Sequence, residues 1–167
     1  MKLRAFGIVI GQNNRFETTT FRRGTQIKIG HNNAFTTGLR LWPINEKFNG
    51  DRISIGNNNY FNRGVILDAC GLIEIGNFNM LGPDIYITDS NHSFGNMVSP
   101  AQSEMNRGTV KVGNHCWIGA KAVILKDVTL GDYCVVGAGS VVTKSFPAGS
   151  VIAGVPAKSI KNSLPGA

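Results

Sequence analysis

Aliphatic residues recur at every sixth position over long stretches of the chain, often followed directly by glycine. A period of six is neither the helical period of 3.6 nor the plain alternation of a strand. It is typical of a short strand and a turn, repeated many times. The clearest run comprises Val112, Ile118, Ile124, Leu130, Val136 and Val142.

Earlier stretches keep the same spacing, for example Ile55, Phe61 and Leu67, then Ile75, Leu81 and Ile87. Three such units would form one triangular coil of about 18 residues, and coils would stack about 4.8 Å apart as parallel strands do. The aliphatic side chains would then fill the interior. We therefore predict an all-β fold, a parallel β-helix, with residues 1–154 as one domain.

Two segments depart from the spacing, at 41–51 and at 89–108, and the second contains His92. Long loops in a compact domain are usually functional or disordered. We expect 89–108 to project from the coil. After Gly154 the pattern ends, and Pro156 suits the first turn of a helix with Gly166 just beyond its end. We expect residues 155–167 to form a short C-terminal helix that caps the last coil.

Three cysteines do not make an even disulfide framework, which favours a reducing cytoplasm. Cys116 and Cys134 are one coil apart and should stack in one inward-facing column. The natural interpretation of both is packing rather than a disulfide bridge or a catalytic thiol.

The net charge of +7 comes from scattered basic residues without an aromatic-rich basic motif, so nucleic-acid binding is not favoured. A polyanionic small molecule would need only a few converging lysines. No apolar run approaches the roughly 20 residues of a transmembrane helix, so no membrane span is predicted.

Three segments together resemble the hexapeptide-repeat acetyltransferases, notably the galactoside, maltose and xenobiotic acetyltransferases. They are "IEIGNFNMLGPDIYITDSNH", "VGNHCWIGAKAVIL" and "VTLGDYCVVGAGSVVTKSFPAGSVIAGVPAKSIK", within residues 55–161. The resemblance implies a left-handed β-helix, acetyl-CoA as co-substrate without a metal, and homotrimers with active sites between subunits.

The resemblance assigns His92 as the general base. A sugar hydroxyl attacks a thioester well only when its proton is removed, and an imidazole titrates near neutrality. The same imidazole can return the proton to the leaving thiolate. We therefore expect direct transfer in a ternary complex, with a backbone N–H near a turn stabilising the oxyanion.

The resemblance also suggests contacts for the acceptor and for coenzyme A. Asn62 and Trp117 match acceptor-side positions, although a turn asparagine and an interface tryptophan are equally natural interpretations. Small side chains would let the pantetheine approach the backbone, and lysines would meet the phosphates as point charges. The coenzyme positions are Ala120, Gly137, Ala138, Thr143, Lys144, Lys158 and Lys161.

The acceptor is open. The repeat begins near residue 3, without the N-terminal helical segment of the galactoside and maltose enzymes, which favours another carbohydrate from a surface-polysaccharide or nucleotide-sugar pathway. Trp42 in the 41–51 segment is a candidate for stacking on a sugar. N-acetylation of an amino sugar, or of an antibiotic, is the alternative.

Two rival functions use the same fold. A zinc-dependent carbonic anhydrase needs three converging histidines, two of them close in sequence. His31 and His115 instead fall at matching turn positions, apart from His92. A catalytically silent β-helix that only binds a ligand is the second rival, and His92 with the coenzyme A positions argues against it.

Overall fold

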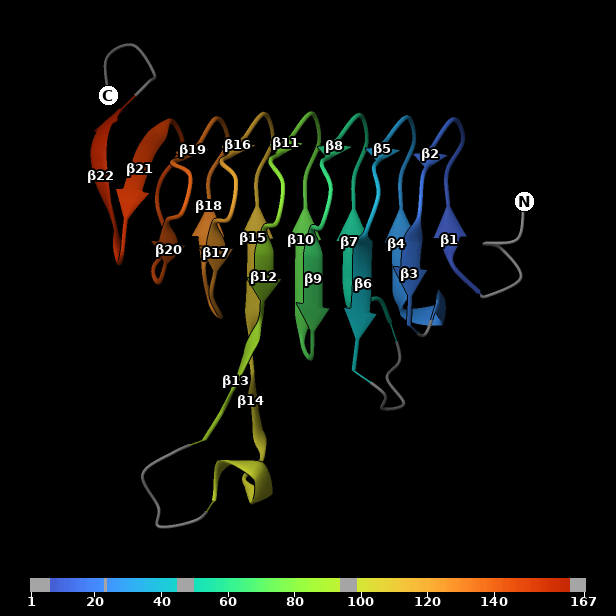
Figure 1. The fold of residues 1–167 in the computed structure, drawn as a ribbon, viewed down its shortest axis with the longest axis horizontal. Helices are drawn as coiled ribbons and strands as arrows, with labels where there is room; N and C mark the ends of the chain where they lie inside the picture. The colour runs from blue at the N-terminus through green and yellow to red at the C-terminus, as the bar shows by residue number, and fades with distance from the viewer. Residues whose placement is uncertain (1–6, 23, 45–49, 94–98, 163–167) are drawn as a thin grey trace.

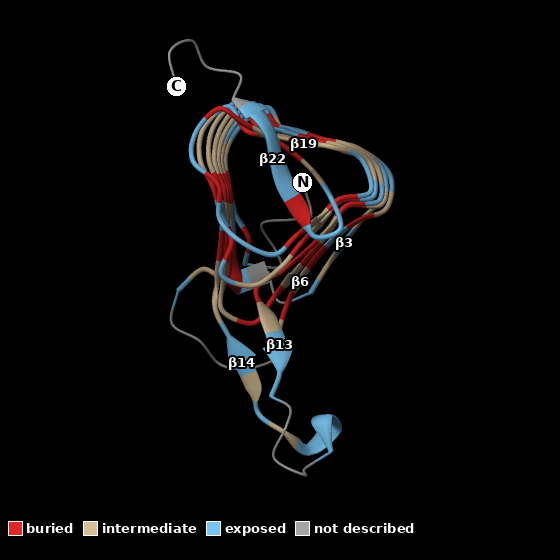
Figure 2. Ribbon diagram, turned by 90° about the vertical axis from the view of Figure 1, so that its left-hand side faces the viewer, coloured by how far each residue is buried: buried red, intermediate tan, exposed pale blue. Residues whose placement is uncertain are grey.

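Three sheets wrap around one interior and form a triangular prism in the computed structural model, which describes residues 7–22, 24–44, 50–93 and 99–162 (Figures 1 and 2). All their strand pairs are parallel except the last pair of the second sheet. The first face contains β1 (Val9–Ile10), β4 (Ile27–Ile29), β7 (Ile53–Ile55), β10 (Leu72–Ile75), β15 (Thr109–Val112) and β18 (Thr129–Leu130). The second contains β2 (Arg15–Phe16), β5 (Ala34–Phe35), β8 (Tyr60–Phe61), β11 (Met80–Leu81), β16 (Trp117–Ile118), β19 (Val135–Val136), β21 (Ser150–Gly154) and β22 (Ala157–Asn162). The third contains β3 (Thr19–Phe21), β6 (Leu39–Pro43), β9 (Ile66–Ala69), β12 (Tyr86–Thr88), β17 (Val123–Ile124) and β20 (Val141–Val142).

The six-residue spacing places every aliphatic of the clearest run inside the prism. Its members, Val112 to Val142, are each at most 2% exposed. Successive coils pair in register, so that Val112 lies beside Leu130 and Ile118 beside Val136. The predicted parallel β-helix and its filled interior are confirmed, because each strand buries one aliphatic while its backbone bonds the coils on either side.

The prism has three corners, which we name by what they contain. The aromatic corner lies between the first and second faces, the groove corner between the second and third, and the arm corner between the third and first. At the aromatic corner, a column of buried side-chain amides bonds coil to coil. For example, the backbone N–H of Asn59 donates to Asn33 Oδ1 and that of Asn79 to Asn59 Oδ1, both at 2.8 Å.

The same column continues into the two stacked cysteines. The backbone N–H of Cys116 donates to Asn79 Oδ1 at 2.7 Å, and Cys134 follows one coil later. The hydrogen bond to Cys134 and burial raise the pKa of Cys116, so it remains a neutral thiol. Cys70, Cys116 and Cys134 are all free and buried, which agrees with the packing interpretation of Cys116 and Cys134.

The predicted C-terminal helix is wrong for the described residues. After Gly154 the chain reverses and Ala157–Asn162 forms β22, antiparallel to β21 (Figure 1). Pro156 lies in this reversal rather than in a first helical turn. The physical reason is that the edge of β21 presents unpaired backbone groups, which a returning strand satisfies and a helix would not. Residues 163–167 lie outside the described part.

Both predicted insertions begin later in the chain than expected. Leu41, Trp42 and Pro43 complete β6, so the 41–51 segment leaves the coil only after Pro43, and 45–49 lie outside the described residues. Asp89 also remains within the prism, at 0% exposure. The projecting segment, which we call the arm, is therefore residues 90–107.

The arm is a narrow hairpin that leaves one corner of the prism (Figures 1 and 2). Its strands are β13 (Ser90–His92) and β14 (Met105–Arg107), paired antiparallel, with a 3₁₀ turn at Pro100–Gln102 beyond them. A second 3₁₀ turn spans Gly24–Gln26 in the prism. Residues 94–98 of the arm are not described. The expected projecting loop is confirmed, and it begins at the arm corner.

Candidate active site

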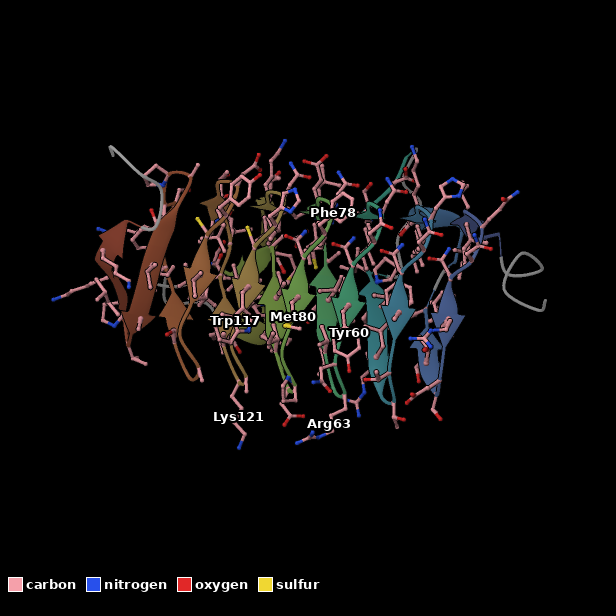
Figure 3. The ribbon with its side chains drawn as sticks, turned by 90° about the horizontal axis from the view of Figure 1, so that it is seen from above. Tyr60, Arg63, Phe78, Met80, Trp117 and Lys121 are labelled. Atoms are coloured by element: carbon pink, nitrogen blue, oxygen red, sulfur yellow. The ribbon has the colours of Figure 1, made fainter. Side chains whose placement is uncertain are left out.

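Outward-facing apolar side chains form a stripe across neighbouring strands of the second face (Figure 3). Tyr60 lies beside Met80, Met80 beside Trp117, and Trp117 beside Val135. Met80 and Trp117 are 53% and 55% exposed, which is unusual for large apolar side chains. An exposed apolar stripe of this kind marks a surface that contacts a ligand or another protein.

The stripe borders a groove of about 450 Å³ at the groove corner. The predicted residues Asn62, Trp117, Ala120, Gly137 and Ala138 all line it, so the structure brings these five together. The other lining residues are Tyr60, Met80, Leu81, Gly82, Pro83, Gly119, Val135 and Val136.

The floor of the groove carries little side chain because the coils leave no room for it. A Cβ on Gly119 would lie 2.6 Å from the Ala138 nitrogen, and one on Gly82 would lie 2.8 Å from the Ala120 nitrogen. The glycine N–H groups themselves bond the next coil, as Gly119 does to the Val136 carbonyl at 2.8 Å. In the described part of the chain no hydrogen bond engages the N–H of Ala120 or Ala138, so both can donate to a ligand.

Asn62 lies in the groove wall, and its side chain bonds the backbone of the turn to which it belongs. Its Oδ1 accepts from the backbone N–H of Arg63 at 2.8 Å, which leaves the amide NH₂ available to a ligand. Arg63 and Lys121 lie along the same edge of the second face, beside the stripe (Figure 3). The groove therefore combines an apolar wall, backbone donors and a cationic edge.

His92 lies on the arm and not at the groove. It is exposed, in β13, and pairs with Met105 of β14. The arm leaves the prism where β12 of the third face ends, whereas the groove lies where the second face ends. Within one chain, His92 and the groove thus belong to different corners.

The remaining predicted coenzyme residues also lie away from the groove. Thr143 and Lys144 follow β20 at the arm corner, and the Lys144 ammonium lies 5.7 Å from the Phe146 ring centroid. Lys158 and Lys161 are exposed on β22 at the end of the second face. The predicted set therefore divides between the two corners and the last strand.

The base of the arm contains buried titratable groups that the sequence analysis did not identify. Burial raises the pKa of Asp89 to about 6, against the lowering effect of hydrogen bonds from Cys70 and Gly71. Arg52, at 1% exposure, also favours the ionised carboxylate. No signal in the sequence marks Arg52, because it directly precedes the inward Ile53, where the alternation of a strand predicts a solvent-facing side chain.

The outward stripe was also missed apart from Trp117. Its signal is that Tyr60, Met80 and Val135 each directly precede an inward residue, where the alternation of a strand predicts a solvent-facing side chain. Apolar residues at outward positions are therefore the readable mark of this surface. Trp42, the candidate for sugar stacking, lies in β6 with the Arg22 guanidinium 5.5 Å from its ring centroid.

The other two histidines occupy the aromatic corner, as turn residues. His31 Nδ1 accepts from the backbone N–H of Gln12 at 3.0 Å, and His115 stacks between Phe78 and Tyr133 at 5.0 and 4.8 Å. The sequence predicted matching turn positions for the two histidines, and this is wrong by one residue. The strands β4, β7, β10 and β15 pair in register one after another, and this register aligns His31 with Asn114. Among the described residues, no group of three or more metal-binding side chains comes together.

Comparison with known proteins identifies the repeat. Residues 109–144 match the family described as bacterial transferase hexapeptide (six repeats). Over 148 residues, the chain is 32% identical to a protein of Escherichia coli (strain K12) that carries the name lipopolysaccharide biosynthesis O-acetyl transferase WbbJ, covering 84% of this chain and 74% of that protein. Three further relatives are matched over half of their length or less.

Two solved structures show a similar arrangement. One is a galactoside acetyltransferase in complex with coenzyme A, with a TM-score of 0.66 and 27% identity over 93% of this chain and 65% of that one. The other is AntD, an N-acyltransferase from Bacillus cereus in complex with dTDP and 3-hydroxybutyryl-CoA, with a TM-score of 0.80 and 21% identity over 98% of this chain and 87% of that one.

No helix in the described part of the chain is long and apolar enough to cross a membrane. The matched repeats name a transferase, and the relative from Escherichia coli carries the name of an O-acetyl transferase. The chain therefore belongs to the bacterial hexapeptide-repeat transferases and is an acyltransferase of that family.

Proposed function

We propose that the protein transfers an acetyl group from acetyl-CoA to a hydroxyl of a carbohydrate, in a homotrimer with active sites between neighbouring subunits. The observation that carries this proposal is the separation of His92 and the groove on two corners of one chain. A base that cannot meet the groove of its own chain can meet that of a symmetry-related copy. The left hand of the coil, which the resemblance implies, belongs to the same proposal.

The coenzyme would lie in the groove with one subunit on each side. Ala120 and Ala138 offer unengaged N–H groups to the amides of the pantetheine, and the apolar stripe shields the thioester from water. Thr143 and Lys144 lie at the arm corner, so the subunit that supplies His92 would supply them too. Lys158 and Lys161, exposed on β22, would meet the phosphates.

His92 would act on the acceptor hydroxyl. Its imidazole takes the hydroxyl proton as the oxygen attacks the thioester carbonyl, and a tetrahedral intermediate forms. When the intermediate collapses, the carbon–sulfur bond breaks, and the imidazolium returns its proton to the coenzyme A thiolate. No enzyme-bound acyl group is required, which agrees with the buried, neutral state of the Cys116 thiol.

Oxygen rather than nitrogen is our choice of acceptor atom, from a surface-polysaccharide or nucleotide-sugar pathway. The support is the name of the Escherichia coli relative, an O-acetyl transferase of lipopolysaccharide biosynthesis. We assign the reaction to the cytoplasm, where acetyl-CoA is made and where three free cysteines remain reduced. A thiol-release assay across sugars, amino sugars and nucleotide-sugars tests the acceptor, and turnover restricted to amines would replace O-acetylation by N-acetylation.

The shared site is tested by mixing two inactive variants. His92→Ala removes the base, and Ala138→Trp fills the groove from an exposed position. After denaturation and joint refolding, a site made from the arm of the Ala138→Trp chain and the groove of the His92→Ala chain is intact. Random mixing should restore about a quarter of the wild-type sites. If the mixture stays inactive while each variant assembles normally, the inter-subunit site is wrong.

A further inference from the structure

Asp89 is a buried carboxylate at the base of the arm, and the chemistry proposed for His92 does not use it. It is 0% exposed. The backbone N–H groups of Cys70 and Gly71 donate to its two carboxylate oxygens at 2.7 and 2.9 Å. Its own carbonyl accepts from the backbone N–H of Gly108 at 2.8 Å. Asp89 thus bonds the departing chain to the preceding coil and to the residue where the arm returns.

Arg52 and Gly71 complete this anchor. The Arg52 guanidinium donates to the carbonyl of Cys70, and its charge stabilises the ionised form of Asp89. A Cβ on Gly71 would lie 2.1 Å from the Gly108 carbonyl oxygen, so the returning strand is packed directly on backbone. Two charges this deeply buried persist only when each has partners, which makes the arrangement specific.

The described strands of the arm carry exposed side chains. Asn91, His92, Asn106 and Arg107 are exposed, and an isolated two-stranded hairpin is marginally stable in water. A general base must nevertheless lie within about 0.5 Å of its productive position. The base of the arm is buried and bonded to the preceding coil, so it can supply this rigidity.

We propose that Asp89, supported by Arg52, is a positioning residue that directs the arm so that His92 reaches the groove of the neighbouring subunit. Asp89 touches neither the substrate nor the coenzyme. The inference rests on the role proposed above for His92, and it adds a determinant inside the prism to that role.

Asp89→Asn is the main test, because the amide can accept only one of the two N–H groups and turns its own NH₂ toward the other. We expect kcat to fall at least tenfold while KM for acetyl-CoA stays within twofold, since the groove lies at another corner. The matched control is Asp132→Asn. Asp132 also accepts a backbone N–H of the preceding coil, from Asn114 at 2.7 Å, at a position where that coil uses asparagine. An unchanged kcat in a folded Asp89→Asn protein overturns the proposal.

A double variant separates positioning from general structural support. In a His92→Ala background, Asp89→Asn should reduce the residual single-turnover rate by less than twofold, because there is no base left to position. A further tenfold fall in that background would mean that Asp89 acts independently of His92, and the proposal would be wrong. Should Asp89→Asn fail to fold, Gly71→Ala strains the same anchor from the opposite side and should reproduce the loss of kcat.

Amide hydrogen exchange tests the anchor without any turnover. Peptides covering 86–93 and 105–108 should exchange faster in Asp89→Asn than in the wild type or in Asp132→Asn. Equal exchange in all three proteins contradicts the proposal. If instead His92→Ala keeps full activity while exchange responds as expected, the function proposed for His92 fails and the anchoring by Asp89 stands.

Discussion

The groove corner and the arm corner are built from the same repeat and are opposite in character. At the groove corner every turn is short, glycine and alanine leave the backbone accessible, and the neighbouring surface is apolar. At the arm corner one turn opens into a hairpin, and buried charges lie beneath it. In the proposed function, the regular stacking provides the binding surface, whereas the interruption carries His92, to which we assign the chemistry.

The two corners also differ in how they satisfy polar groups. The groove corner uses backbone N–H groups that follow automatically from coil geometry. The arm corner needs the particular side chains of Asp89 and Arg52, because an interrupted coil leaves backbone donors that no strand can satisfy. A substitution at the groove corner should therefore affect mainly binding, and a substitution at the arm corner should affect mainly catalysis.

The largest expected effect is at the arm. His92→Ala should lower kcat by roughly 10² to 10⁴, because it removes proton transfer from the transition state. Acetyl-CoA should still bind, as measured by calorimetry, with a Kd within twofold of the wild type. Normal turnover by His92→Ala would show that His92 is not the general base and that the arm corner has no catalytic role.

The next effect should be the same at both corners, because they share one interior. Leu81 leads into the groove corner and Ile87 leads to the arm corner, and both are 0% exposed. Leu81→Ala and Ile87→Ala should each lower the free energy of unfolding by about 2 to 5 kcal/mol, measured in urea at one protein concentration. A loss of unfolding free energy below about 1 kcal/mol for either variant would show that the interior beside that corner is loosely packed.

Filling the groove should damage binding without reaching the arm. Ala138→Trp should lower kcat/KM for acetyl-CoA about a hundredfold, close to 3 kcal/mol, with a Tm near that of the wild type. Thr20→Trp, which places the same ring on an exposed outward position of β3, is the control and should leave the kinetics unchanged. Equal losses in the two variants would contradict the location of the site.

A smaller effect should appear in the pH dependence of stability. Burial raises the pKa of Asp89 from 3.8 to about 6, with Asp68 raising it further and Arg52 opposing. The folded state then holds this proton more tightly than the unfolded state. The resulting stabilisation is complete below about pH 4 and is lost as the pH rises through about 6, and it amounts to at most about 3 kcal/mol.

Asp89→Asn isolates that contribution. The unfolding free energy of the wild type relative to Asp89→Asn should be higher at pH 4.5 than at pH 7.5, with both proteins measured by urea denaturation under matched salt. A constant difference between wild type and Asp89→Asn across this range would contradict the raised pKa.

Much of the fold and part of the site could be predicted from the sequence. The inward column needed only the six-residue spacing, whereas Trp117, Ala120 and Ala138 were predicted through the resemblance to hexapeptide-repeat acetyltransferases, and all three line the groove. The C-terminal strand could not be predicted, because Pro156 and Gly166 are compatible with a helix. The chain forms β22 instead because β22 pairs with the open edge of β21, which exists only in the folded structure. Asp89 was assigned to the insertion because its anchoring partners, Cys70 and Gly71, lie one coil earlier.

By itself, the sequence determined the repeated strand and turn, the filled interior, and the turn at which the chain leaves the coil to carry His92, but not the residue at which it leaves. These properties are local, since each aliphatic faces inward because of its own position in a unit of six. Only the tertiary structure decided which residues share a corner, because stacking joins residues from separate coils. It also separated His92 from the groove, since successive corners of a three-sided coil point in different directions.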